Sequence, residues 1–114
     1  MSAAATLDTP AEVRTEFHRA VNMTPAQLER WLDSDESRAV GITHDGEHES
    51  VGHQSGRRIV QLLRKKAADL DDDDLAHMRK VIGYVHRHLK QKPAHPEHSR
   101  WRASLMNWGH DPMK

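Results

Sequence analysis

One short segment of the chain combines the residue types that bind a phosphate group. Ser55 opens a predicted helix, and Arg57 and Arg58 occupy its first turn. A helix N-terminus carries unpaired N–H groups and a partial positive charge, so two arginines there are unfavourable for the isolated helix. A bound phosphate would accept the N–H groups, the serine hydroxyl and a bidentate guanidinium. The segment is compatible with an anion site; in the alternative interpretation, the arginines pair with acids of the first half, such as Glu47 or Glu49.

Basic side chains continue at helical spacing beyond this segment. They follow two predicted helices on the side opposite the apolar residues, and could line one positive face. Six phosphate contacts would make log affinity fall with log salt concentration at a slope of about −5. Arginine and glutamine also read the edges of guanine and adenine. We therefore predict a phosphate-binding or nucleic-acid-binding surface, with an ordinary solvated helix face as the alternative. Its residues are Ser55, Arg57, Arg58, Gln61, Arg64, Lys65, Arg79, Lys80, Arg87 and Lys90.

Ten histidines raise the question of a metal site. The best candidates are His44, His48 and His53, but their spacing matches no known ligand pattern. His86 and His88 lie on different faces of a helix and make a poor chelate. We predict no metal site and no cofactor.

The remaining chemical patterns have structural interpretations. The acidic run 71–74 precedes a helix and suits an N-cap better than a cation site. His53, Ser55 and Asp111 lack the spacing of a hydrolase triad, so we predict no catalysis.

Charge is distributed unevenly along a chain whose 17 basic and 17 acidic residues cancel. Residues 1–50 hold ten acids and four arginines, whereas residues 51–114 hold thirteen basic residues and seven acids. A basic half favours a polyanion over a neutral small molecule. The absence of cysteine and of a long apolar stretch predicts a cytoplasmic protein without a membrane span.

Apolar spacing predicts an all-α protein of about five helices in one domain over residues 9–114, after a flexible tail at 1–8. Thr9-Pro10 and Thr24-Pro25 are helix start signals. The turn between these two helices is compatible with a helix-turn-helix. A third helix runs from Ser55 to about Leu70, and the irregular stretch 35–54 precedes it. The last two helices cover about 75–89 and 99–108, with Trp101 and Trp108 in the core.

Several segments together resemble a small family of unknown function found in bacterial genomes, whose members are often labelled "DNA-binding protein". They cover about residues 12–112, and the label implies no target and no catalytic residues. The matching segments are Val21-Asn-Met-Thr-Pro25, Leu28-Glu-Arg-Trp-Leu32, Glu49-Ser-Val-Gly-His53-Gln-Ser-Gly-Arg-Arg-Ile59, Leu75-Ala-His-Met-Arg-Lys-Val81, Tyr84-Val-His-Arg-His88 and Trp101-Arg-Ala-Ser-Leu-Met-Asn-Trp-Gly-His-Asp-Pro112.

These observations lead to two hypotheses. The first is a protein that contacts the phosphate backbone of nucleic acid, most simply duplex DNA, through a basic helical face. The second is a protein–protein interaction module, or a homodimer joined through its acidic and basic halves.

Overall fold

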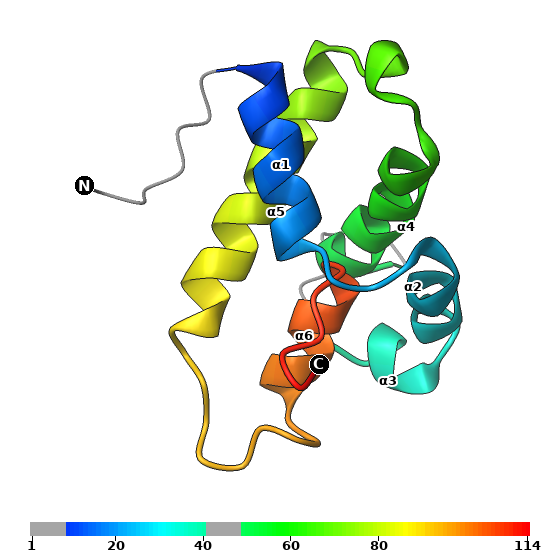
Figure 1. The fold of residues 1–114 in the computed structure, drawn as a ribbon. Coiled ribbons are helices and arrows are strands. Elements are labelled where there is room, and N and C mark those ends of the chain that lie inside the picture. The colour runs from blue at the N-terminus through cyan, green and yellow to red at the C-terminus, as the bar shows by residue number, and fades with distance from the viewer. Residues whose placement is uncertain (1–8, 41–48) are drawn as a thin grey trace, which may run out of the picture.

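Helices form every regular element that the structure, a computed structural model, describes over residues 9–40 and 49–114. The prediction of one all-α domain is confirmed. The predicted tail at 1–8 and residues 41–48 of the predicted irregular stretch 35–54 lie outside the described residues. No described helix is long and apolar enough to cross a membrane. The elements are α1 (Pro10–Ala20), α2 (Pro25–Leu32), α3 (Asp35–Arg38), α4 (Val51–Arg64), the 3-10 turn η1 (Ala67–Asp69), α5 (Asp72–Leu89) and α6 (Arg100–Asn107) (Figure 1).

Side-chain caps determine where the helices begin. Thr9 and Thr24 each accept the backbone N–H three residues on, and each precedes a proline at the first helical position. Asp71 caps α5 in a reciprocal capping box with Asp74. Ser99 caps α6. The helix starts predicted from these residues are confirmed, as is the capping role of the acidic run.

Three predicted boundaries near α4 are wrong. The helix begins at Val51, because the Ser50 hydroxyl accepts the N–H of His53 and caps it four residues earlier than expected. It ends at Arg64, and η1 follows, so the apolar spacing that continues to Leu70 belongs to two elements. Part of the stretch predicted to be irregular forms α3, which Ser34 caps.

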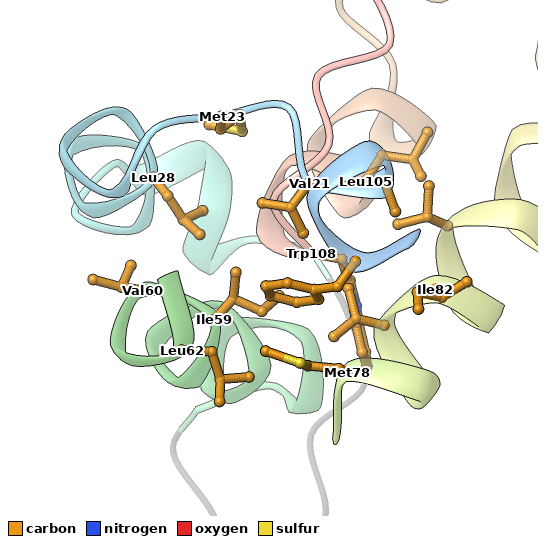
Figure 2. Packing of buried hydrophobic residues seen from close by; sticks show 14 of the residues in the cluster. Val21, Met23, Leu28, Ile59, Val60, Leu62, Met78, Ile82, Leu105 and Trp108 are labelled. Atoms are coloured by element: carbon orange, nitrogen blue, oxygen red, sulfur yellow. The ribbon is translucent and has the colours of Figure 1, made fainter. Parts of the chain in front are cut away.

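The helices pack in two pairs, α1 on α5 and α2 on α4, and α6 contacts helices of both pairs (Figure 1). The two helices joined by the turn at Asn22 thus pack mainly on other partners, and not on each other. The core lies between the pairs, where Ile59 of α4, Met78 of α5 and Leu105 of α6 are almost completely buried (Figure 2).

The C-terminal segment closes this core. Trp101 and Trp108 are buried, as predicted. Gly109 has a φ of 82°, which only glycine adopts readily, and an added Cβ would lie 2.9 Å from Val21. This turn lets the Gly109 carbonyl accept the N–H of Met23 and ties the C-terminal segment to the turn between α1 and α2.

Candidate nucleic-acid interface

Ser55 is buried and faces the interior. It lies in the second turn of α4, where its hydroxyl is 2.9 Å from Nε2 of His77 on α5. The predicted phosphate site needs this hydroxyl at a helix N-terminus, and the helix begins at Val51 instead. Ser55 therefore links α4 to α5 and is not positioned as a surface ligand.

The N-terminus of α4 is packed against α6. An added Cβ on Gly56 would lie 2.5 Å from the backbone oxygen of Asn107, and one on Gly52 would lie 3.1 Å from Nε1 of Trp108. Both glycines let the two helices approach closely. Backbone and rings of the protein itself therefore occupy the space beside this helix terminus.

A carboxylate of the chain already meets the charges at the start of α4. Glu49 accepts a hydrogen bond from Arg57 at 2.5 Å and contacts Nδ1 of His53. Burial would raise the pKa of Glu49, but the hydrogen bonds from His53 and Arg57 outweigh it and hold the pKa below its ordinary value. The alternative interpretation, in which Arg57 pairs with an acid of the first half, is confirmed for Glu49.

Three of the predicted residues line one cleft between α2 and α4. The cleft has a volume of about 390 Å³, and Arg57, Gln61 and Arg64 form part of its wall. Arg64 donates two hydrogen bonds to Glu29 of α2, at 2.6 and 3.1 Å. This hydrogen bonding lowers the pKa of Glu29 and raises that of Arg64. The guanidinium groups on this side of α4 are thus held by carboxylates.

The other two predicted cations of this region converge on Asp74. Lys65 lies 2.6 Å from one of its oxygens and Arg58 lies 3.5 Å from the other. The hydrogen bond from Lys65 is the main cause of the lowered pKa of Asp74. Asp74 also accepts the N–H of Asp71, so one buried carboxylate caps α5 and binds two cations. Arg58 pairs here, and not with the first half of the chain.

Helix α5 presents its basic residues differently. Residues 75–96 contain five Lys and Arg residues and no acid. Lys80, Arg87 and Lys90 are exposed, and among residues 9–40 and 49–114 no carboxylate lies within 4.0 Å of them. Their spacing of seven and three residues places them along one side of the helix. Arg79 is also exposed and lies one position from Lys80.

A column of four aromatic rings lies beside the basic side of α5, where the helix meets the C-terminal end of α6. The rings of His77, Trp108, Tyr84 and His88 stack in that order, with centroid separations of 6.3, 4.2 and 5.1 Å and interplanar angles under 20°. Burial, with Arg58 and Lys80 adding charge repulsion, lowers the pKa of His77 to about 4. Burial likewise lowers the pKa of His88. His77 is therefore neutral at pH 7.

The other candidate chemistry does not assemble among the described residues. They contain no cluster of three or more His, Asp or Glu side chains that could hold a metal ion. His44 and His48 lie outside the described residues, so of the three histidines considered as metal ligands the structure describes only His53. Asp111 pairs with Arg102 at 3.2 Å, and neither His53 nor Ser55 bonds to it.

Two residues of this region were not predicted from the sequence. His77 was not recognised as the partner of Ser55, because 22 residues separate them and no local pattern links the two. Asp74 was interpreted only as part of a helix cap. One signal was present in the sequence but was not used: the acid-free run 75–96 marks α5 as the helix with exposed, unneutralised charge.

Residues 16–106 match the family described as "Protein of unknown function (DUF3140)". The chain belongs to this family. DUF3140 carries no assigned activity in that description, so membership identifies the kind of domain and leaves its role open. No curated protein and no solved structure matches the chain.

Proposed function

We propose that this DUF3140 domain binds the phosphate backbone of duplex DNA through the outward face of α5. The observation that carries the proposal is the set of exposed cations Lys80, Arg87 and Lys90 on a helix segment without acids. Lysine and arginine side chains that meet phosphates release condensed counterions, which is the main source of affinity in sequence-independent binding. Arg79 would extend the same contact surface.

The predicted residues of α4 take a smaller part in this proposal. Arg57 and Arg64 would have to give up Glu49 and Glu29 before meeting a phosphate. Arg58 is closer to the proposed surface, because its charge acts on His77 together with that of Lys80. We therefore place Arg58 at the edge of the DNA contact, and Gln61 and Arg64 outside it.

The character of the surface favours a hydrated polyanion over an apolar partner. Among the described residues, Met113 is the one large hydrophobic side chain that is exposed. Stable protein interfaces usually bury an apolar centre, whereas DNA interfaces are polar, wet and strongly basic. The proposal includes no catalytic step and no sequence specificity. It suits a cytoplasmic protein, where nucleic acid is present and a chain without cysteine is unaffected by reducing conditions.

A salt titration tests the proposal. Affinity of the full chain for a random 20-base-pair duplex would be measured by fluorescence anisotropy between 20 and 300 mM NaCl. Three phosphate contacts predict a plot of log affinity against log salt with a slope of about −3. Absence of binding at 20 mM NaCl would overturn the proposal.

A second candidate function is self-association through the two ends of α5. The exposed Asp72 and Asp73 begin the helix and Arg87 and Lys90 lie near its end, so that two copies could pair antiparallel. The same salt series in light scattering distinguishes the two functions. A dimer that dissociates as salt rises, in a protein that does not bind DNA, would favour self-association.

A further inference from the structure

Gly83 occupies an unusual place in the middle of α5. It lies on the side of the helix that carries the exposed cations, and its own surface is partly exposed. Glycine has the lowest helix propensity of any residue except proline, because it loses the most backbone freedom on folding. A glycine in a long helix is expected where something must approach the backbone closely.

At the other described glycines, close packing within the protein explains the absence of a side chain. An added Cβ on Gly56 or Gly52 would meet α6, and one on Gly109 would meet Val21 in a backbone conformation reserved for glycine. At Gly83, apart from the backbone of α5 itself, the only atoms of the described residues within 4 Å of an added Cβ belong to the side chain of Arg87, with Nη1 at 2.9 Å. Within residues 9–40 and 49–114, no neighbouring helix or ring requires a glycine at position 83.

The neighbours of Gly83 are all basic or apolar. Lys80 lies three residues before it, Arg87 four residues after it and Lys90 seven residues after it, on the same side of the helix. The guanidinium of Arg87 extends back over the missing side chain. Position 83 therefore has no side chain of its own and is partly covered by the Arg87 guanidinium, and Lys80 lies one turn before it on the same side of the helix.

We infer that a phosphate of the bound polyanion seats at Gly83, between Lys80 and Arg87. The inference rests on the proposed function and specifies its central contact. A phosphodiester oxygen there would accept from the Arg87 guanidinium and the Lys80 ammonium, because both are donors and neither has a carboxylate partner among the described residues. The backbone N–H groups of α5 are used inside the helix at this position, so side chains make the contact.

A small side chain at position 83 should therefore stabilise the helix and weaken DNA binding together. Gly83→Ala displaces the Arg87 guanidinium slightly, and Gly83→Gln places a longer side chain beside it. We expect both variants to melt at a higher temperature than the wild type. We expect Gly83→Ala to lower affinity for the 20-base-pair duplex about threefold at 100 mM NaCl, and Gly83→Gln about tenfold, with a salt slope shallower by about 1.

Ala26→Gln is the matched control. Ala26 is exposed on α2, a helix that packs on α4, and the variant should retain the wild-type affinity. Lys90→Gln serves as a second control, because it should weaken DNA binding whether or not Gly83 is a contact point.

The outcomes separate the inference from the proposed function. If Lys90→Gln weakens binding and Gly83→Gln binds as tightly as the wild type, DNA binding stands and the Gly83 contact is overturned. If the wild type does not bind DNA at low salt, both fail. A lower melting temperature for Gly83→Ala would also contradict the inference, because it would mean that glycine serves the fold itself.

Discussion

The basic side chains of α4 and its C-cap all lie within 4.0 Å of a carboxylate, whereas Lys80 and Arg87 of α5 have no such partner among the described residues. In the sequence, the basic residues of α4 and those of α5 follow the same kind of helical spacing. What separates them is the nearest acid in space: Glu29 and Glu49 flank one side of α4, and Asp74 the other. Exposed charge therefore depends on which helices pack together, and counts along the chain do not reveal it.

The largest effect is expected when the unpaired charges of α5 are removed. Combining Lys80→Gln, Arg87→Gln and Lys90→Gln deletes three phosphate contacts, which should lower affinity for duplex DNA about 500-fold at 0.1 M salt and flatten the salt slope by about 2.7. Fluorescence anisotropy measures both quantities. The comparison variant, Arg57→Gln with Arg64→Gln, should stay within about threefold of the wild type. Equal losses in the two variants would show that pairing does not separate the helices.

A second, smaller effect concerns His77, whose pKa is lowered by burial and further by the charges of Arg58 on α4 and Lys80 on α5. Burial lowers this pKa from an ordinary 6.5 to about 4, so the unfolded chain binds a proton more readily between these values. The contribution to stability is complete above pH 6.5 and decreases as the pH falls towards 4. The loss should reach up to about 3 kcal/mol in the free energy of unfolding.

Urea unfolding between pH 4.5 and 7.5 measures this effect. His77→Phe keeps a ring against Trp108 but cannot be protonated, and should lose most of the dependence on pH in that range. A wild type and variant with parallel pH profiles would show that His77 is not desolvated in the way described. Adding Lys80→Gln to the wild type should reduce the slope slightly, because one of the two repelling cations is removed.

A third prediction converts paired cations into free ones. Asp74→Asn removes the carboxylate that holds Arg58 and Lys65 and weakens the cap of α5, so the melting temperature should fall by roughly 5 °C. Arg58 would then be free beside Lys80. One additional phosphate contact should raise affinity for DNA about eightfold at 0.1 M salt. Unchanged affinity in a folded Asp74→Asn variant would place Arg58 outside the contact surface.

The smallest effect is expected when a carboxylate partner is removed on the other side of α4. Glu29→Gln frees Arg64, but this guanidinium faces the cleft between α2 and α4 and not the outward face of α5. At 0.1 M salt, charges more than about 10 Å apart are largely screened. Affinity for DNA should change by less than about twofold. A rise like that expected for Asp74→Asn would move the binding surface towards α2.

Much of the fold could be predicted because its signals are local. Thr9, Thr24 and Ser99 cap helices where a cap residue precedes an apolar repeat, and the spacing from Leu75 to Leu89 predicts α5 closely. The start of α4 could not be predicted in the same way, because the residues after its Ser50 cap are small and polar. Gly52 and Gly56 are typical of loops in the sequence, and the structure shows that they are needed where α4 packs closely against α6.

The candidate site was less predictable for a different reason. Arg64 meets Glu29 across 35 residues of chain, and Ser55 meets His77 across 22. Such partners are decided by the packing of α2, α4 and α5, and no spacing within one helix indicates them. The four basic residues of α5 could be named from their helical repeat, since their exposure follows from one amphipathic pattern.

The ring column of His77, Trp108, Tyr84 and His88 has a consequence for how α5 can move. Rotating a helix by one residue turns every side chain by about 100°, and such a rotation would move His77 and Tyr84 off the Trp108 indole at the end of α6. The stacked rings therefore restrict rotation of α5 about its long axis. A partner that binds the basic side of α5 therefore meets a helix whose rotation is already fixed, and only the exposed side chains lose freedom on contact.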